Sequence, residues 1–288
     1  MLTRILDLFF TYLMLLLSVG FSTCSKDEPL RDLREESAHF IILTNSKNST
    51  SSEISQVLTQ AEQLYERIAA IVGEAHTPVN KITIRMEGSF TDQGPYFNDQ
   101  GIHIFRYSRE ENGYLSLLAH EMVHAFREPF YLEKETWNWP AYPYFDEGFS
   151  EYIAQLVDST KTGFPFYGFP ESVVVGHMVL HKQHIPHTVM RGRHEAFNQP
   201  CNIQTYPARA SWCRYIDEVY GRDALFALIF AEQEPTALVV QEVIGVDLSV
   251  LDQDWETWIV EKYQEIKDAD RIAQQYLERV SWYAFCDS

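Results

Sequence analysis

The chain has 288 residues, of which 45% are hydrophobic and 14% are aromatic, so it carries ample material for the core of one large domain or two small ones. Its formal net charge of -18 at pH 7 argues against polyanionic partners, because their phosphates would meet like charge over most of the surface. Nucleic acid is therefore not an expected partner.

The first residues are typical of an export signal. An apolar run from Leu8 to Val19 follows Arg4, and it is short for a membrane span. The letters "FSTC" before "SKDEP" are similar to the end of a bacterial lipoprotein signal, in which the cysteine is lipidated. We therefore predict a signal peptide over 1–24, lipidation of Cys24, and an exported protein of the cell envelope or a secreted one, which meets the membrane only through this anchor. An ordinary signal peptide cut nearby and an uncleaved anchor are the alternatives.

The other cysteines are Cys201, Cys213 and Cys286. In an exported protein two of them can pair, and Cys201 and Cys213 are the nearest in sequence. The odd number then leaves one cysteine over, and the spacing fits no cysteine metal site.

The next third of the chain is predicted to be rich in strands. After a polar linker over 25–36, "HFIILT" at 39–44 is typical of a buried strand, and the apolar spacing from Ile54 to Val72 predicts an amphipathic helix. "KITIRM" at 81–86 and "GIHIFRY" at 101–107 predict two more strands, separated by a loop rich in Gly, Asp and Asn.

From Tyr114 onward the pattern is mostly helical, beginning with a helix that starts near Asn112. We expect a domain over 37–288, with an α+β half at 37–132 that contains a mixed sheet and a helical half at 133–288. Further helices are predicted at 149–156, 171–182, 208–220, 223–231 and 236–244, with two more towards the C-terminus.

A motif typical of metal binding lies at the junction of the two halves, in "LLAHEMVHAF" at 117–126. On a helix, His120 and His124 lie on one face, about 6 Å apart along the axis, so both imidazoles can reach one ion. Glu121 projects beside that ion and can take a proton from a bound water. We expect one Zn²⁺ per chain, although cobalt, manganese or iron could use the same ligands.

A catalytic zinc needs a third protein ligand from a separate element. The stretch "YFDEGFSEYIA" at 144–154 offers Glu147 and Glu151, which lie one helical turn apart. A second helix that folds back on the first can present either carboxylate to the metal.

These two motifs together resemble the gluzincin metallopeptidases, the superfamily that includes thermolysin and the aminopeptidase N family. The resemblance covers most of residues 37–263 and implies a zincin-like fold. It is a resemblance in particular to small uncharacterised exported or lipoprotein members of this superfamily. It implies that Glu147 is the third ligand and that Glu151 orients His120. The reverse assignment, with Glu151 on the metal, is the alternative.

The resemblance also implies residues around the substrate. The segment at 206–221 is similar to one in small gluzincin-like proteins, which makes Tyr206 the candidate donor to the oxyanion, with capping and packing of its helix as the alternative. "GIHIFRY" resembles the family's edge strand, which pairs with an extended substrate, or it is only a sheet edge. No exopeptidase motif precedes the zinc helix.

The function implied is a zinc-dependent hydrolase that cleaves peptide bonds in a peptide or protein substrate. One alternative is hydrolysis of an amide or ester that is not a peptide, because a ligand set fixes the reaction better than the substrate. The other is a catalytically inactive, lipid-anchored binding protein that keeps the fold.

Two further features have competing interpretations. His177 and His181 repeat the four-residue spacing and could hold a second metal, but Met178 stands where the catalytic Glu would be, which favours surface or core histidines. His187 or His194 could line the cleft and assist the oxyanion. The aromatic residues between the motifs could wall a substrate pocket or only pack a long loop: Phe130, Tyr131, Trp137, Trp139, Tyr142, Tyr144 and Phe145.

Overall fold

The structure is a computed structural model of the chain. It describes residues 32–45, 47–88, 96–105, 114–127, 144–158, 166–182, 202–231 and 236–280. The predictions for the signal peptide, for the aromatic residues at 130–142 and for several single residues lie outside these ranges: Cys24, His187, His194, Cys201 and Cys286.

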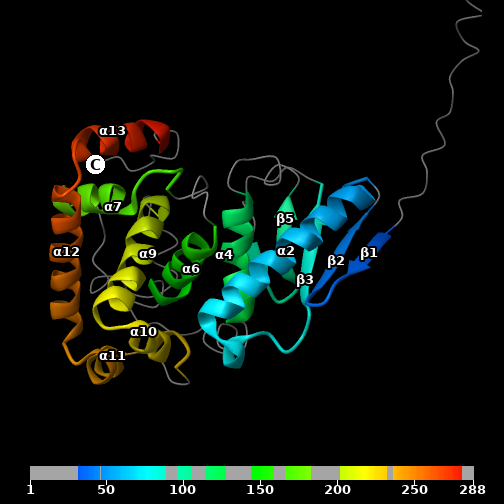
Figure 1. The fold of residues 1–288 in the computed structure, drawn as a ribbon, viewed down its shortest axis with the longest axis horizontal. Coiled ribbons are helices and arrows are strands. Elements are labelled where there is room, and N and C mark those ends of the chain that lie inside the picture. The colour runs from blue at the N-terminus through cyan, green and yellow to red at the C-terminus, as the bar shows by residue number, and fades with distance from the viewer. Residues whose placement is uncertain are drawn as a thin grey trace, which may run out of the picture. The chain divides into compact units, whose positions relative to one another are not determined.

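A five-stranded mixed sheet forms in the N-terminal half, in the order β1-β2-β3-β5-β4 (Figure 1). The three central strands run parallel to one another, and the two outer strands are antiparallel to their neighbours. The strands are β1 (Asp32–Glu36), β2 (Phe40–Asn45), β3 (Ile82–Glu87), β4 (Tyr96–Asn98) and β5 (Gly101–Phe105). The predicted α+β class with a mixed sheet is confirmed.

Two strands and one strand position differ from the sequence-based predictions. Strand β1 lies within the predicted linker, where "DLREE" has no apolar alternation because the strand is charged and mostly exposed. Strand β4 lies in the predicted loop, and its three residues are too few to show a period. Because β4 pairs with β5, the prediction that 101–107 forms the sheet edge is wrong: β5 lies between β3 and β4.

Helix α2 (Ser51–Val72) connects β2 to β3 and packs on the sheet, as a parallel pair of strands requires. It begins with a capping box: Thr50 accepts from the backbone N–H of Glu53, whose carboxylate accepts from the backbone N–H of Thr50. Gly73, with φ +85°, ends it. Its apolar stripe is buried: Ile54, Val57, Ala61, Leu64, Tyr65, Ile68 and Val72.

Helix α4 (Tyr114–Phe126) carries the His-Glu-x-x-His motif and packs against both halves. It contacts β4 and β5 on the sheet side and makes extensive contact with α6 (Phe149–Val157). A π-helical turn, η2 (Tyr144–Gly148), runs directly into α6. The two motifs therefore lie on helices that pack against each other (Figure 1).

The remaining described helices form the C-terminal half, as predicted. Helix α9 packs against η2 and α6, and α12 and α13 pack against α7. None of the described helices combines the length and apolar character needed to cross a membrane. These helices are α7 (Glu171–Leu180), α9 (Asn202–Val219), α10 (Arg222–Ile229), α11 (Ala237–Ile244), α12 (Leu248–Gln264) and α13 (Ala269–Val280). A short 3₁₀ turn, η1 (Glu74–His76), lies in the N-terminal half between α2 and β3.

Gly148 allows α9 to approach the second motif closely. Its backbone is helical, with φ -64° and ψ -42°, so no special conformation demands glycine there. A Cβ atom at this position would lie 2.7 Å from the backbone oxygen of Arg209. The missing side chain is therefore what lets α9 pack directly on the junction of η2 and α6.

Candidate metal centre

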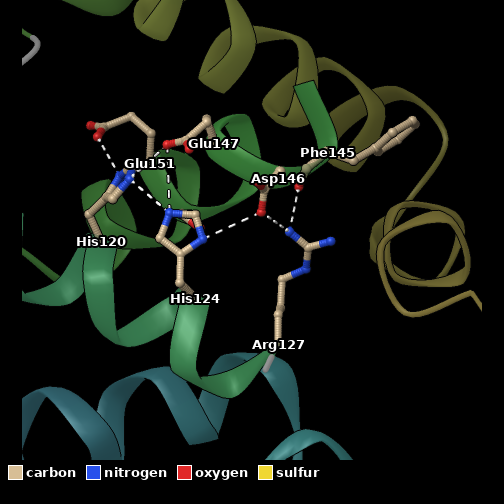
Figure 2. Close-up of polar contacts among 8 residues, drawn as sticks. His120, His124, Arg127, Phe145, Asp146, Glu147 and Glu151 are labelled. Atoms are coloured by element: carbon tan, nitrogen blue, oxygen red, sulfur yellow. Dashed lines mark hydrogen bonds and ion pairs between the residues drawn. The ribbon is translucent and has the colours of Figure 1, made fainter. Parts of the chain in front are cut away.

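The structure brings His120, His124 and Glu147 together, and their ligand atoms lie within 4.8 Å of one another. The two histidine Nε2 atoms are 3.2 Å apart. Glu147 Oε2 lies 3.2 Å from Nε2 of His120 and 3.6 Å from Nε2 of His124 (Figure 2). All three residues are less than a tenth exposed. Within the ranges that the structure describes, no other group of three such residues meets the same criterion.

These separations fit a tetrahedral ion. Zinc bonds to imidazole nitrogen and carboxylate oxygen of about 2.0–2.1 Å place neighbouring ligand atoms roughly 3.3–3.4 Å apart. The three measured separations, 3.2, 3.2 and 3.6 Å, bracket that value. With three protein ligands, a tetrahedral ion keeps one position for water or substrate. The residues present therefore fit a zinc site of the catalytic type.

The other nitrogen of His120 faces Glu151, which approaches from the side away from Glu147. Glu151 Oε2 lies 3.2 Å from Nδ1 of His120. Because an ionised carboxylate only accepts hydrogen bonds, we assign the hydrogen to Nδ1, which leaves the lone pair of Nε2 facing the ligand group. Gln155 Nε2 in turn donates to Glu151 Oε1 over 3.4 Å.

The other nitrogen of His124 faces a second buried arrangement. Asp146 Oδ1 lies 3.4 Å from its Nδ1, and Ser150 Oγ lies 3.3 Å from the same atom. Arg127, three residues beyond His124 on the chain, donates through Nη1 to Asp146 Oδ1 over 3.0 Å and to the backbone oxygen of Phe145 over 3.1 Å (Figure 2). The ion pair between Arg127 and Asp146 joins the end of α4 to η2.

The surroundings favour positive charge at the ligand group. Burial would lower the pKa of both histidines, but the carboxylates around them outweigh it: the pKa of His124 rises to about 9, and that of His120 rises well above its ordinary value. Burial would likewise raise the pKa of Glu147, yet the two histidines hold it well below its usual range. An environment that stabilises an added proton in this way also attracts a metal cation.

Glu121 and Tyr206 lie beside the ligand group. Burial raises the pKa of Glu121 to about 7, with Glu147 and Asp146 adding to the effect and the histidines opposing it, so this carboxyl can exchange a proton near neutral pH. The Tyr206 ring centre is 6.1 Å from that of His120. Burial and the adjacent Glu147 carboxylate raise the pKa of Tyr206 well above its ordinary value, which keeps the phenol a hydrogen-bond donor.

Other predicted residues do not join this group. The rings of His177 and His181 lie 4.2 Å apart, but in the described part of the chain no third ligand joins them. Cys213 is a fully buried thiol, and Cys201, its predicted nearest partner, lies outside the described residues. Of the aromatic residues between the motifs, Phe145 is fully buried against Trp212, which is packing.

Four residues that support the two histidines have no predicted role: Asp146, Ser150, Arg127 and Gln155. The contact of Asp146 with His124 could have been suspected from its place next to Glu147. Nothing in the spacing points to Arg127 or Gln155, whose contacts depend on how α4, η2 and α6 pack. Comparison with protein-family models and with curated proteins finds no match to this chain.

Proposed function

We propose that this protein is a zinc-dependent hydrolase of the gluzincin type that cleaves peptide bonds. The observation that carries the proposal is the buried group of His120, His124 and Glu147, whose ligand atoms are spaced as a tetrahedral ion requires. The His-Glu-x-x-His motif and the later Glu147-to-Glu151 segment supply this group in the order that the gluzincin resemblance implies.

In the proposed reaction, His120, His124 and Glu147 would hold the ion, and Glu151 would fix the orientation of His120. When bound, zinc acts as a Lewis acid that activates both a water molecule and the carbonyl group that this water attacks. Glu121 would take the proton from the attacking water and pass it to the leaving amine. The Tyr206 phenol would donate a hydrogen bond to the oxygen on which negative charge develops.

The ligand assignment can be tested by the metal content of the purified protein, measured by plasma mass spectrometry next to His124→Ala and Glu147→Ala. About one zinc per chain is expected, and each variant should lose it, because two remaining ligands bind weakly. A wild-type protein that holds no zinc after dialysis against zinc would contradict the proposal.

The reaction itself can be tested with Glu121→Gln, assayed against denatured proteins and short peptides. This variant should keep its zinc and lose at least about a hundredfold in turnover, because general base catalysis contributes roughly 10²–10⁴-fold. Glu66→Gln, on the exposed face of α2, is the matched control and should change nothing. If a zinc-loaded wild type cleaves none of the peptides, hydrolysis of a different amide or an ester is favoured instead.

We also propose that the protein is exported and anchored through Cys24, which rests on the N-terminal sequence alone. Growth with a labelled fatty acid should label the wild type and leave Cys24→Ala unlabelled. Label in both proteins, or in neither, would contradict the anchor.

A further inference from the structure

A half-open cavity of about 360 Å³ lies on the other side of Glu151 from the ligand group. Its described walls include Glu151, Gln155 and Ser116, but none of His120, His124 and Glu147. Because Glu151 contacts Nδ1 of His120, while the ligand atom of that ring is Nε2, the cavity lies behind the histidine rather than at the ion's open position. It is therefore a separate space from the proposed reaction site.

One wall of the cavity is apolar and aromatic. Phe166 and Ile259 are buried, and Phe169 and Trp258 are partly exposed and line the same space. Such a wall suits an apolar side chain of a ligand, and the volume suits a small molecule rather than a folded partner.

Apart from Glu151, whose carboxylate faces Nδ1 of His120 and accepts from Gln155, the charged groups that line the cavity form two ion pairs. In the inner pair, Arg214 Nε donates to Glu171 Oε2 over 2.9 Å, with side-chain exposures of 21% and 11%. In the outer pair, Lys262 Nζ donates to Glu218 Oε2 over 2.8 Å, with exposures of 38% and 42%. Each pair offers one cation and one carboxylate, so a ligand that carries both a negative and a positive group would find an opposite charge for each.

Arg214 keeps donor capacity for a ligand. Its Nη2 donates to Gln155 Oε1 over 3.1 Å, and its guanidinium lies over the Tyr152 ring at 5.1 Å. Its Nη1 makes no hydrogen bond to the residues that the structure describes. Burial would lower the pKa of Arg214, but the Glu171 carboxylate outweighs it, so the cation is maintained. A fixed guanidinium with a spare N–H is suited to a carboxylate.

We propose that this cavity binds a small zwitterion with an apolar side chain, such as a free amino acid or a short peptide. Its carboxylate meets Arg214 and Lys262, its ammonium group meets Glu218 or Glu171, and its side chain packs on the Phe169 and Trp258 wall. Such compounds are what the proposed peptidase would release. To that extent the inference deepens the proposed function, although the site itself depends only on the cavity.

The first test is calorimetric titration of the purified protein with L-phenylalanine, L-phenylalaninamide and N-acetyl-L-phenylalanine. L-Phenylalanine should bind one to one. The amide lacks the carboxylate and the acetyl compound lacks the ammonium group, and each should bind about 10- to 100-fold more weakly, as loss of a charge-assisted hydrogen bond implies. Failure of both L-phenylalanine and L-leucine to bind, or equal binding of either derivative, would overturn the proposal.

The second test uses variants of the protein. Arg214→Gln should weaken L-phenylalanine binding by a similar factor, and Arg214→Lys by less, because it keeps the charge but loses the fork. Arg222→Gln is the matched control: Arg222 also pairs with a carboxylate, that of Asp217, but does not line the cavity. Equal binding by Arg214→Gln and the wild type would overturn the proposal.

The outcome is separable from that of the proposed hydrolase. His124→Ala should lose zinc yet bind L-phenylalanine as the wild type does, because His124 does not line the cavity. Loss of binding in this variant, with its fold intact by circular dichroism, would overturn the separation of the two sites.

Discussion

The two histidines of the motif are one helical turn apart but are held in different ways. His124 is fixed by Asp146, which is completely buried and is braced by the equally enclosed Arg127. His120 is fixed by Glu151, from which a chain of hydrogen bonds runs through Gln155 to Arg214 at the half-open cavity. One histidine is thus tied to the packing of the fold, and the other to a surface that a ligand can reach.

Substitutions on the two sides of the centre should therefore have different effects, one mainly on the free energy of unfolding and the other mainly on zinc binding. Removing one partner of the buried ion pair on the His124 side leaves the other charge in the interior, which lowers the free energy of unfolding. Removing a partner on the His120 side changes polar groups at the wall of the half-open cavity, so it should alter the proposed metal site more than the fold.

The largest effect is expected for Arg127→Met, which removes the guanidinium that donates to the fully buried Asp146. The free energy of unfolding should fall by about 3–5 kcal/mol, the usual cost of breaking a buried ion pair from one side. Denaturant unfolding in the presence of a chelator measures this without the contribution of bound metal.

The double variant Arg127→Met with Asp146→Asn removes both charges and should recover part of that loss. A single variant within about 1 kcal/mol of the wild type would show that the pair does not brace the site.

A smaller loss is expected for Gly148→Ala at the junction of η2 and α6. The added Cβ would lie 2.7 Å from the backbone oxygen of Arg209, so α9 must move or the helices must strain. Overpacking of this kind costs about 1–3 kcal/mol in the free energy of unfolding, measured again with denaturant. Alanine otherwise favours a helix at this backbone geometry. Unchanged stability would therefore mean that α9 can shift away from the added methyl group without a cost in free energy.

On the His120 side, Gln155→Leu should weaken zinc binding about tenfold, because it removes a partner of Glu151 without touching the ligands. Competition with a coloured chelator measures the affinity. Gln253→Leu, at an exposed position of α12, is the matched control and should bind zinc normally. If the two variants bind zinc equally well, the chain from Arg214 does not reach the metal.

The smallest effect is expected away from the centre, for Glu62→Gln on α2. Burial would raise the pKa of Glu62, but hydrogen bonds from the backbone N–H and the ring Nδ1 of His39 outweigh it and lower that pKa. The ionised carboxylate therefore favours folding above the ordinary glutamate pKa of about 4.3, and this contribution is lost as the pH falls through the lowered value.

The Glu62→Gln variant should be less stable by about 0.5–1 kcal/mol at pH 7 and equal to the wild type at pH 2. Unfolding curves at the two pH values test this, and an equal difference at both would exclude the ionised pair as its cause.

The elements that could be predicted from the sequence are those in which a periodic apolar pattern extends over many residues, or which carry a motif. Helix α2 has six turns of apolar spacing and a capping box, and the Glu147-to-Glu151 segment carries its own spacing. Strands β1 and β4 could not be predicted, because one is charged and exposed and the other has three residues. Such strands form because they pair with a neighbouring strand, and the local sequence pattern does not show this pairing.

The candidate ligands were predictable in part from spacing along helices, which marks His120 and His124 and offers Glu147 or Glu151. The resemblance to gluzincins, not the spacing, selected Glu147. The residues that support these ligands were not predictable. Arg127 meets Asp146 only because α4 packs on η2, and Gln155 meets Arg214 only because α6 packs on α9. These contacts join residues 19 and 59 positions apart, which a reading of neighbours along the chain does not link.

The π-helical turn ahead of α6 has a consequence for how the sequence can change. Its wider turn places two consecutive carboxylates, Asp146 and Glu147, on opposite nitrogens of His124 while α6 continues unbroken. Deleting one residue from 144–148 would restore a regular helix and rotate what precedes the deletion by about 100° relative to α6. Insertions and deletions should therefore be tolerated less well in this turn than in the connecting segments, because its length sets where both carboxylates lie.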